Sequence, residues 1–564
     1  MNLKIKIPMV LWFSLLVPAW AFASTYYVDC NRGSDTNQGT STSTAWKTIA
    51  RANLNTYLPG DSILLKRGCV WSEPGFKAQG NGTAASPITL ADYGNGAPPE
   101  INGVGDHEAA VLLENVQYWT VRNLDLTQTG QSPQALCFDS SNDCDQRSDE
   151  YMRAVVHVLG LGGPAGVQTC GDPGTACHIR LENLKVHDGS WNGIYVSGGF
   201  YQLNTGVFGY VEDVVVTGVE SWNHHKSGIQ MTCTYYKTKI YATKNIQVLD
   251  SNLHDNGGDG AMIGPVENGL LDGNNCAYNG RLRNARVGCW TWDSLNTTIQ
   301  FTESHHNMTP LTSDRARDGG GFDLDLGTED GMIQYNWSHD NQGEGFLLLT
   351  YPIHYGYARG ITHNAQMRYN IGERDGKKLA GGITVFGGVA PAVIYNNTIY
   401  YEPDRLAGTV MFNGEGGALT TSVYGQSGKP DLRTYNNIFI TNGTVNSQAV
   451  SNNVWSDGAG TFTFNHNLWW RVEGGVRYAW GSKVINTWPG WQKLGFDPNG
   501  LNADPLVFGP LGAGPSAYQL SPGSPAIDAG QVVTDALRGM GTRDYFGTPI
   551  PQGCCFDIGA AEKP

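Results

Sequence analysis

Short apolar stretches alternate with polar turns over most of the chain. In the segments that begin at Leu181, Val211, Asn245 and Met332, an apolar stretch is followed by a turn rich in Asn, His, Asp and Ser, then by Gly and a second apolar stretch. A looser copy begins at Met367. Copies that follow one another directly are about 20–35 residues apart, which is the spacing of the coils of a solenoid.

The apolar stretches have the composition of β-strands. They are short, rich in Val, Ile and aromatic residues and bounded by Gly and Asn, and helical periodicity is nearly absent. Asn suits the turns because it tolerates a left-handed backbone conformation and can stack in hydrogen-bonded ladders. We therefore predict an all-β fold, one long parallel β-solenoid with loop insertions. A β-sandwich, the alternative, would need frequent hairpin turns and strict alternation.

Both ends of the predicted solenoid resemble a known family. The segments YYVDCNRGSDTNQGTSTSTAWKTI, LPGDSILLKRG and SPITLADYGNGAPPEING resemble the N-terminal cap and first coils of secreted right-handed parallel β-helix proteins of the pectate-lyase-like superfamily. The tail, with YQLSPGSPAIDAG and FDIGAAE, resembles their closing segment. The resemblance implies one β-helix domain over residues 24–564, with a cap and first coils at 24–105 and a closing segment at 500–564. It allows both polysaccharide lyases and glycoside hydrolases, because this fold hosts both chemistries.

The first residues are predicted to be a signal peptide. Lys4 and Lys6 precede an apolar run from Ile7 to Trp20, and the sequence AFA at residues 21–23 has the form of an A-x-A cleavage site. Cleavage after Ala23 would leave a secreted or periplasmic protein. No later stretch approaches the ~20 apolar residues that a membrane span needs.

The composition narrows the class of partner. Only 16% of the 564 residues are charged, aromatic residues are abundant and the formal net charge is −14. The low charge and many aromatics exclude a disordered chain. The acidic balance argues against nucleic acid or an anionic membrane surface, because both are bound through basic patches. We expect a polysaccharide or oligosaccharide instead, with no nucleic acid and no membrane span.

The cysteines fit an oxidising compartment, since all eleven follow the predicted signal peptide. Several pairs bracket short loops, although connectivity cannot be deduced from sequence alone. A zinc site is disfavoured because the chain has no C-x-x-C pair. The expected disulfides are Cys137–Cys144, Cys170–Cys177, Cys276–Cys289 and Cys30–Cys69, which leave Cys233, Cys554 and Cys555.

A glycine precedes the second strand of each copy and supplies a register between copies. If the residue after each glycine points inward, Asp323 and Asp325 share one exposed strand face, about 6.5–7 Å apart along the backbone. Phe322, Leu324 and Leu326 then face the core. The glycines are Gly193, Gly228, Gly260, Gly321, Gly345 and Gly382, and the outward columns are Tyr195, Gln230, Met262, Asp323, Leu347, Thr384 and Ser197, Thr232, Gly264, Asp325, Leu349, Phe386.

Two carboxylates on one rigid strand are suited to glycoside hydrolysis, which uses an acid with a base or nucleophile about 5–9.5 Å away. Their mutual repulsion should raise one pKa and keep one partner protonated near neutral pH. The alternative is that the pair is solvated or holds a cation. An insertion at 304–321 lengthens the preceding turn, and further acids precede the glycines of flanking copies. The insertion brings His305, His306, Asp314, Arg315, Arg317 and Asp318, and the flanking acids Asp259 and Glu344 join Asp318 as reserve catalytic candidates.

Other residues are candidates for binding substrate or a metal ion. The run at 224–226 is either a sugar-binding or a solvated turn. A basic loop with Arg281, Arg283 and Arg286 lies near two tryptophans that are suited to stacking on sugars, or is simply pinned by cysteines. The acidic segment 139–150 offers calcium ligands or is an exposed loop. His254, His306 and His339 recur at turns that we take as equivalent. Either they form a row that binds metal ions or they reflect a repeated turn structure. We favour the repeated turn, except for His306, which is closest to the proposed site. The substrate-binding candidates are His306, Arg315, Arg317, His225, Lys226, Trp290 and Trp292.

The residues favour a secreted or periplasmic glycoside hydrolase whose acid and base or nucleophile are Asp323 and Asp325. No cofactor is expected for hydrolysis. The first alternative is a polysaccharide lyase in which Arg315, Arg317 or Lys226 is the base and the aspartates hold calcium. The second is a non-catalytic carbohydrate-binding solenoid. The G-x-S-x-G, P-loop and H-E-x-x-H motifs are missing from the sequence, which argues against the common serine hydrolases, nucleotide-binding enzymes and zincins.

Overall fold

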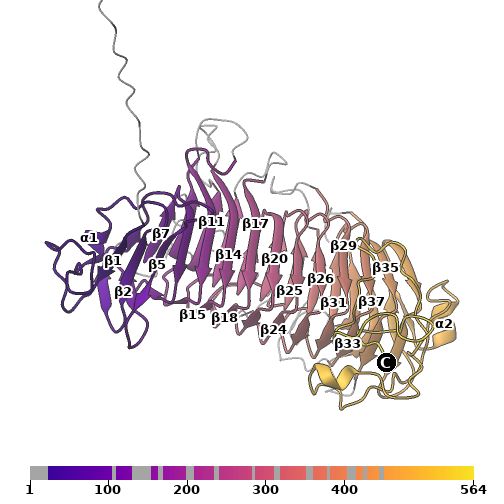
Figure 1. Ribbon diagram of the computed structural model, residues 1–564. Helices are drawn as coiled ribbons and strands as arrows, with labels where there is room; N and C mark the ends of the chain where they lie inside the picture. Colours follow the sequence, from indigo (N-terminus) through magenta and orange to yellow (C-terminus); the bar gives the residue numbers. More distant parts are fainter. Residues whose placement is uncertain are drawn as a thin grey trace, which may run out of the picture.

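In the computed structural model, the chain forms an elongated parallel β-helix whose coils stack from the N-terminal to the C-terminal end (Figure 1). Each coil contributes one strand to each of three sheets, A, B and C, as the repeated pattern predicts. The structure describes residues 23–104, 109–129, 154–162, 169–198, 209–233, 241–282, 286–309, 318–350, 360–377, 381–402, 415–423, 428–443 and 450–564.

Sheet A is the first sheet of each coil, and all its strand pairs are parallel in the described residues. Buried residues such as Val214, Val216 and Ile246 alternate with more exposed ones, so one face packs inward. Its strands are β1 (Thr25–Val28), β2 (Ser62–Lys66), β5 (Ile88–Tyr93), β8 (Gln117–Arg122), β11 (Thr175–Glu182), β14 (Tyr210–Thr217), β17 (Thr243–Leu249), β20 (Glu267–Asp272), β23 (Thr298–Gln300), β26 (Met332–Gln334), β29 (Ala365–Arg368), β32 (Ala392–Tyr395), β35 (Asp431–Tyr435) and β38 (Thr461–Asn465).

Sheet B follows after a tight turn, and most of its strands have only three or four residues. The middle residue faces the core, as Leu253 and Cys276 do, and its neighbours face outward. Its strands are β3 (Val70–Glu73), β6 (Glu100–Gly103), β9 (Asp125–Thr127), β12 (Lys185–His187), β15 (Glu220–Trp222), β18 (Asn252–His254), β21 (Asn275–Ala277), β24 (Glu303–His305), β27 (Trp337–His339), β30 (Ile371–Glu373), β33 (Thr398–Tyr401), β36 (Ile438–Thr441) and β39 (Leu468–Arg471).

Sheet C completes each coil, and the long connections of the chain lead into or out of its strands. Many of these strands are buried on both faces, in contrast to the alternating strands of sheet A. Its strands are β4 (Phe76–Lys77), β7 (Val111–Glu114), β10 (Ala154–Gly160), β13 (Asn192–Gly198), β16 (Ile229–Cys233), β19 (Ala261–Ile263), β22 (Cys289–Trp292), β25 (Phe322–Asp325), β28 (Phe346–Leu349), β31 (Ile383–Phe386), β34 (Glu415–Ser422), β37 (Val450–Ser456), β40 (Tyr478–Trp480) and the antiparallel β41 (Lys483–Ile485).

The interior is one hydrophobic stack that runs along the solenoid. Equivalent residues of successive coils lie on top of one another, because the strands are paired in register. Phe322 and Phe346, for example, stack with ring centroids 5.4 Å apart, and Leu324 and Leu348 continue the same face fully buried. Burial of this continuous apolar surface is the main favourable contribution to folding.

A row of buried asparagines closes the turn from sheet A to sheet B. The side-chain amide of each but the last donates to the Oδ1 atom of the asparagine one coil further on, at 2.9–3.1 Å, and its backbone N–H donates to the same oxygen. The last, Asn467, donates to Asp497 instead. The ladder therefore satisfies polar groups that have no access to water. Its members are Asn336, Asn370, Asn397, Asn437 and Asn467.

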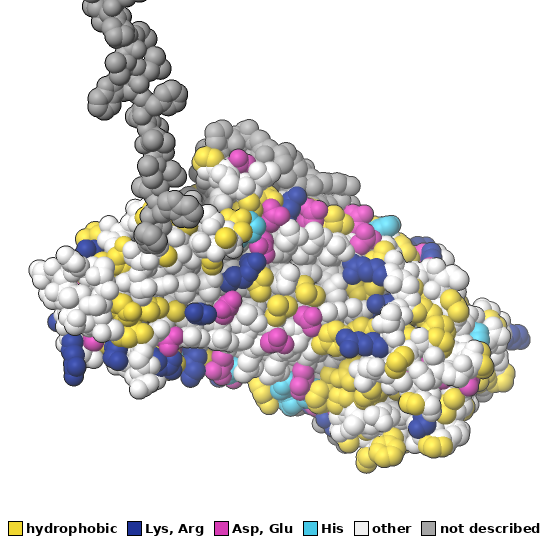
Figure 2. All heavy atoms as spheres, in the orientation of Figure 1, with side chains coloured by type: hydrophobic (Ala, Val, Ile, Leu, Met, Phe, Trp, Pro, Cys, Tyr) yellow, Lys and Arg dark blue, Asp and Glu magenta, His cyan; other side chains and the backbone are white. Residues whose placement is uncertain are grey.

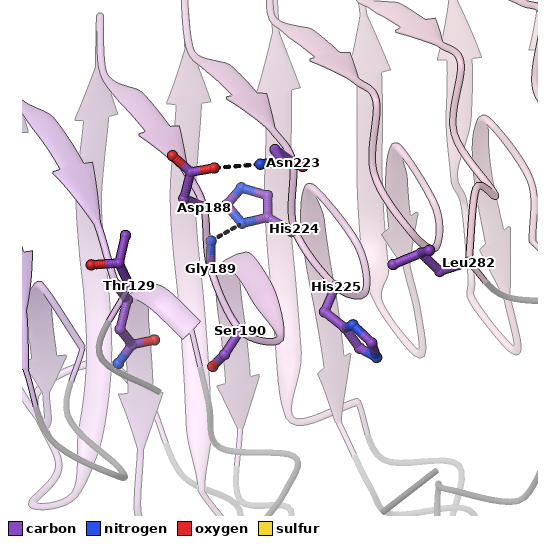
Figure 3. Close-up of a pocket in the computed structure, with 9 residues that line it drawn as sticks. Thr129, Asp188, Gly189, Ser190, Asn223, His224, His225 and Leu282 are labelled. Carbon is purple, nitrogen blue, oxygen red and sulfur yellow. Dashed lines mark hydrogen bonds between the residues drawn. The ribbon is translucent and has the colours of Figure 1, made fainter. Parts of the chain in front are cut away.

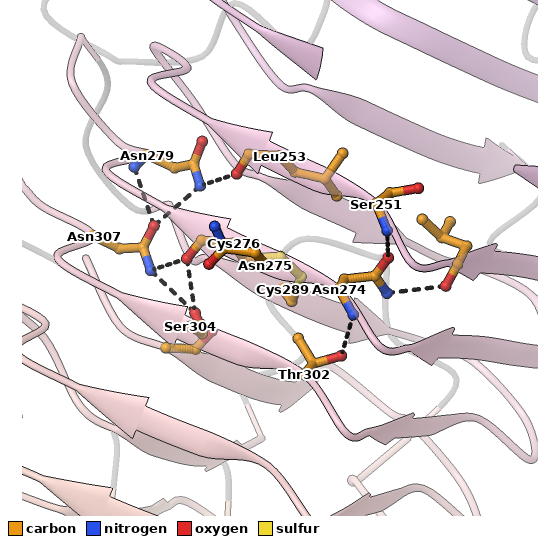
Figure 4. Close-up of a disulfide and its surroundings, with 12 residues drawn as sticks. Ser251, Leu253, Asn274, Asn275, Cys276, Asn279, Cys289, Thr302, Ser304 and Asn307 are labelled. Atoms are coloured by element: carbon orange, nitrogen blue, oxygen red, sulfur yellow. Dashed lines mark hydrogen bonds between the residues drawn. A yellow bond between two sulfur atoms is a disulfide. The ribbon is translucent and has the colours of Figure 1, made fainter. Parts of the chain in front are cut away.

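A second ladder closes the turn from sheet B to sheet C. Asn279 donates to Asn307 at 3.1 Å, and Asn307 donates to Asn341 at 2.9 Å, close to the disulfide between Cys276 and Cys289 (Figure 4). The ladder ends where Asn341 donates to Asp375 at 2.8 Å. These amides bear out the expectation that Asn residues of the turns stack between coils.

The two ends of the stack are covered differently. At the N-terminal end the short helix α1 (Ile49–Ala52) lies near the buried Trp46, which stacks on Tyr26 at 5.0 Å. At the other end the helix α2 (Trp488–Gln492) places the fully buried Trp491 on Tyr478 at 4.2 Å. Among the described residues no helix has the length and apolar character that a membrane crossing requires.

The last residues return along the outside of the helix. The 3-10 turn η6 (Pro515–Tyr518) places Tyr518 in an apolar cluster with Ile371 and Ile438, and Ile558 joins it. The Asn396 side chain donates to the backbone carbonyl of Asp557 at 2.9 Å. Figure 2 shows hydrophobic side chains gathered towards this end of the face it draws.

Three of the expected disulfides are present, namely Cys30–Cys69, Cys170–Cys177 and Cys276–Cys289. Cys554 and Cys555 are free thiols in the structure. The predicted pair Cys137–Cys144 and the side chain of Cys233 lie outside the described residues. Two of the three disulfides span no more than 13 residues, so they pin local loops rather than distant coils.

The amide ladder gives a first prediction. Asn336 accepts from the Thr302 N–H at 3.0 Å and donates to the Ile299 carbonyl at 2.9 Å. Asn336→Ala leaves both buried groups unpaired and should lower the free energy of unfolding by about 2–4 kcal/mol in urea denaturation. The control Asn252→Ala removes one half-buried amide bond to Asn275 and should cost about 1 kcal/mol or less. Equal losses in the two variants would contradict a structural role for the ladder.

Candidate active site

Asp323 and Asp325 project from the outer face of β25 in sheet C. Their neighbours in register are Trp290 and Trp292 on β22, one coil earlier. On the following coil Leu347 of β28 is in register with Asp323. The structure thus brings both aspartates and both tryptophans of the sequence analysis onto one patch of a rigid sheet.

The expectation that this strand face is exposed is wrong. Asp323 is only 2% exposed and Asp325 only 8%. Strand alternation predicts which face a side chain points from, but it does not predict what covers that face. Here large side chains of the adjacent strands, Trp290, Trp292 and Leu347, flank the carboxylates. The aspartates are consequently outside the apolar core yet nearly out of reach of water.

Burial and neighbouring acids favour the protonated form of this pair. The pKa of Asp323 is raised well above its usual value, first by burial and then by the charges of Asp325, Asp318 and Glu344. Burial and Asp318 also raise the pKa of Asp325, while the Leu326 N–H, which donates to its Oδ1 atom at 2.6 Å, works in the opposite direction. Both shifts favour the protonated carboxylic acid, the form that a general acid needs.

Two further acids lie beside the pair. Glu344 is in the turn before β28 and is 2% exposed; burial and the charge of Asp318 raise its pKa to about 8. Asp318 precedes β25 in the chain, pairs by its backbone with Arg286, and is half-buried, so it is the most exposed of the four acids. Both are reserve catalytic candidates in the sequence analysis, and the structure brings both of them close to Asp323 and Asp325.

Several buried polar atoms around the pair have no hydrogen-bond partner within the described part of the chain. They are Asp323 Oδ1, Glu344 Oε2, the Trp290 indole N–H and Gln230 Oε1. Gln230 stands in the same outer row of sheet C, which runs through Met262 and Trp290 to Asp323. Each such atom costs about 1–3 kcal/mol while it is unpaired. A row of this kind is suited to a ligand that offers many hydroxyl groups.

Asp259 has a different environment from the other acids. It is fully buried, and its carboxylate accepts from the Ser227 hydroxyl at 2.9 Å and from the Val287 N–H at 3.0 Å. Arg286 lies 3.5 Å away. These partners tie three successive coils together. Arg281 of the basic loop pairs with Asp255 at 3.2 Å. Arg281 and Arg286 are therefore paired with two different acids.

His225 and Lys226 follow β15, at the turn from sheet B to sheet C. His225 lines a pocket of about 370 Å³ between the turns after β12 and β15 (Figure 3). Lys226 is 2% exposed and its ammonium group lies 5.3 Å from the centre of the Trp191 ring. The other lining residues are Gln128, Thr129, Asp188, Gly189, Ser190, Asn223, His224 and Leu282.

Some candidates of the sequence analysis cannot be placed. Arg315 and Arg317 lie outside the described residues, as do Asp314, Arg283 and the acidic segment 139–150. The site is therefore built only from the acids and aromatic residues of the described strands and turns.

The histidines align differently from the sequence prediction. His254, Ala277, His305 and His339 occupy one column of sheet B, so the equivalent of His339 is His305, and the alignment of His306 was wrong by one residue. His306 stacks on Tyr278 at 5.0 Å, among the residues of sheet B. Strands of three residues leave little pattern from which to fix a register.

The sequence register also left a coil out. It omitted Gly288, which precedes β22, and so did not place Trp290 between Met262 and Asp323. The same glycine signal, followed by Cys289 as the inward residue, could have found it.

Comparison with known proteins identifies the class of fold. A family model described as a right-handed β-helix region matches residues 211–399. Together with the three parallel sheets, this defines the chain as a single right-handed parallel β-helix, as predicted.

The chain is similar over 96% of its length, at 24% identity, to a lacto-N-biosidase from Bifidobacterium longum, and it spans 36% of that relative. Among solved structures it is similar to a GH136 lacto-N-biosidase from Eubacterium ramulus, with a TM-score of 0.51, 21% identity and coverage of 73% of this chain and 67% of the other. A PL6-family alginate lyase has a TM-score of 0.49 at 14% identity, covering 86% and 54%. At 21% identity, the likeness to the GH136 structure shows the fold alone.

The environment of Glu344 predicts how stability depends on pH. Its pKa rises from 4.5 to about 8 on folding, so the folded state resists ionisation and stability falls as pH rises through this interval. Glu344→Gln removes that penalty and should stabilise the protein by on the order of 2–4 kcal/mol at pH 8, with little change at pH 4.5. Melting temperatures across this range would measure it. Glu182→Gln, at a half-buried position on sheet A, is the matched substitution for comparison. A stability difference between Glu344→Gln and the parent protein that does not change with pH would refute the assignment.

Proposed function

We propose that the chain is a glycoside hydrolase that cleaves an oligosaccharide. The observation that carries the proposal is the buried pair Asp323 and Asp325 on one strand face, with raised pKa values. The pair lies beside Asp318 and in register with Trp290 and Trp292. The protonated member would donate its proton to the glycosidic oxygen as the bond to C1 breaks. A second, ionised carboxylate would then attack C1 or take a proton from the attacking water.

The substrate class is proposed from the relatives. The relative that matches 96% of this chain is named lacto-N-biosidase, and a similar solved structure has the same name. Oligosaccharides that contain a lacto-N-biose unit are accordingly the first substrates to test. The unpaired polar atoms of the outer row of sheet C would be satisfied by sugar hydroxyls.

Elimination by a polysaccharide lyase is the second candidate, because four acids over one sheet face could also hold calcium. Elimination also needs a base and a cation that neutralises the uronate carboxylate, and the described residues support these two roles less well than they support the acids of a hydrolase. Lys226 is buried against Trp191, and Arg286 is paired with Asp259. We therefore propose that catalysis needs no cofactor and that activity survives removal of calcium.

We further propose that the protein works outside the cytoplasm, after removal of residues 1–23 as a signal peptide. The three disulfides support an oxidising compartment.

The decisive experiment replaces the acids one at a time. Asp323→Asn, Asp325→Asn and Asp318→Asn should each lower kcat by about 10²–10⁴-fold, because general acid or base catalysis is worth that much. Released sugar would be followed together with the ultraviolet absorbance of unsaturated uronates. Asp272→Asn, on the outer face of sheet A, should keep full activity.

Full turnover in both Asp323→Asn and Asp325→Asn would mean that the site is elsewhere. Ultraviolet absorbance that rises with bond cleavage, and that calcium chelation abolishes, would establish the lyase instead.

The tryptophans test the substrate path. Trp290 and Trp292 are half-buried beside the acids, so their ring faces can stack on a sugar ring next to the bond that breaks. Trp292→Ala should raise KM by about tenfold, the loss of roughly 1.4 kcal/mol of binding, and change kcat less. Trp222→Ala removes a half-buried tryptophan from the outer face of sheet B and should leave KM unchanged. A kcat effect alone in Trp292→Ala would argue against stacking.

A further inference from the structure

The outer face of sheet B carries a repeated pairing of histidine with acids. In three coils the last residue of the strand is His, followed by Asp. The Nδ1 atom faces the carboxylate of that Asp at 2.7–2.9 Å, and the Nε2 atom faces an acid at the start of the preceding strand at 2.8–3.5 Å. We call this arrangement the His–Asp clamp. The three clamps are His187 with Asp188 and Asp125, His254 with Asp255 and Glu220, and His339 with Asp340 and Glu303.

The third clamp differs from the other two because a second imidazole enters it. His305 of β24 occupies the column position directly before His339, where the second clamp has Trp222. The two rings stack with centroids 4.7 Å apart. The Nε2 atoms of His339 and His305 lie 3.1 Å and 3.8 Å from the same oxygen, Oε1 of Glu303. Ligand atoms of the three residues all lie within 4.8 Å of one another.

We propose that Glu303, His305 and His339 form a binding site for a divalent transition-metal ion of the Zn²⁺ type. Two imidazole nitrogens and one carboxylate oxygen, completed by water, are a recurrent donor set for zinc. The spacing of the donors requires only small movements to reach metal–ligand distances of about 2.0–2.2 Å. Hard oxygen-seeking ions such as Ca²⁺ should bind poorly because two of the three donors are nitrogens.

The surrounding residues hold the proposed ligands in place. His339 Nδ1 faces Asp340 at 2.9 Å, the carboxylate–histidine contact that commonly orients a metal ligand. Arg374 and Lys377 each bind Asp340 at 2.7 Å and restrain it. These cations occupy Asp340, which makes it a supporting residue rather than a ligand.

His306 completes the support on the other side. Its Nδ1 atom lies 2.9 Å from Nδ1 of His305. When His305 donates this hydrogen bond, its Nε2 atom keeps a lone pair directed towards Glu303. The site is reached from the side of Glu303, whose side chain is 39% exposed, whereas His305 and His339 are 15% and 10% exposed.

A bound ion would join β24 to β27 at the point where the connection to β25 begins. This site lies on sheet B, and the acids Asp323 and Asp325 lie on sheet C, so the inference does not depend on the proposed hydrolase activity. The expected effect is a gain in stability, since a ligand that binds only the folded state raises the melting temperature.

The test uses the full chain without an affinity tag, after treatment with EDTA. Cys554 and Cys555 are replaced by Ser, because adjacent surface thiols would also bind zinc. Titration calorimetry with ZnCl₂ should then show one equivalent bound and a higher melting temperature, and CaCl₂ should give neither. Co²⁺ should give the visible absorption of a site with nitrogen and oxygen donors.

Matched variants distinguish the site from adventitious binding. His305→Ala and Glu303→Gln should each weaken Zn²⁺ binding by at least about tenfold, since even a supporting residue is worth that much. His254→Gln alters the second clamp, which has no second histidine, and should leave Zn²⁺ binding unchanged. Glu303→Gln, at the exposed edge, serves if His305→Ala does not fold. Absence of Zn²⁺ binding by the parent protein, unchanged affinity in His305→Ala and Glu303→Gln, or a loss of the same size in His254→Gln would overturn the proposal.

Discussion

Hydrogen bonding between successive coils in one fixed register is the constraint on which the structure depends. Parallel strands pair at a spacing of about 4.8 Å, and the turns between them are closed by buried amides that bond to the equivalent residue of the next coil and to the backbone of the preceding one. Asn370, for example, both donates to Asn397 and accepts from Asn336. A slip of one residue in a single coil would unpair these groups and turn core side chains outward. Equivalent residues are therefore forced into rows.

The rows explain how like charges come to lie together. Asp323 and Asp325 cannot move apart, because their strand is paired on both sides with β22 and β28. The unfavourable free energy of holding these acids together shows in their raised pKa values. The packing of the many coils outweighs it. A strand that carried these acids in a small, loosely packed domain could relax and release the proton. Rigid strands of this kind are suited to chemistry that depends on fixed spacing.

The sequence predicted the features that recur in each coil, such as the strand rows. It did not predict features that depend on contacts between coils, such as the burial of a side chain. The glycine before each second strand revealed the row that contains Asp323. Cysteines that bracket short loops revealed two of the disulfides, Cys170–Cys177 and Cys276–Cys289. The sequence did not predict the burial of Asp323, whose neighbours in register are Trp290 and Leu347 of other coils. The one-residue misplacement of His306 has a similar origin, since a three-residue strand carries too little pattern to fix its register.

Pairing separates acids that support the fold from acids that are available for chemistry. Asp340 is bound by His339, Arg374 and Lys377, and these partners hold its pKa far below the usual range. Asp323 and Glu344 are each only 2% exposed, yet each has a carboxylate oxygen without a hydrogen-bond partner in the described residues. A buried charge that is not paired destabilises a protein, so a stack that had only to be stable would gain by replacing these two acids. Their presence close together supports the hydrolysis that we propose, in which a carboxylic acid donates a proton.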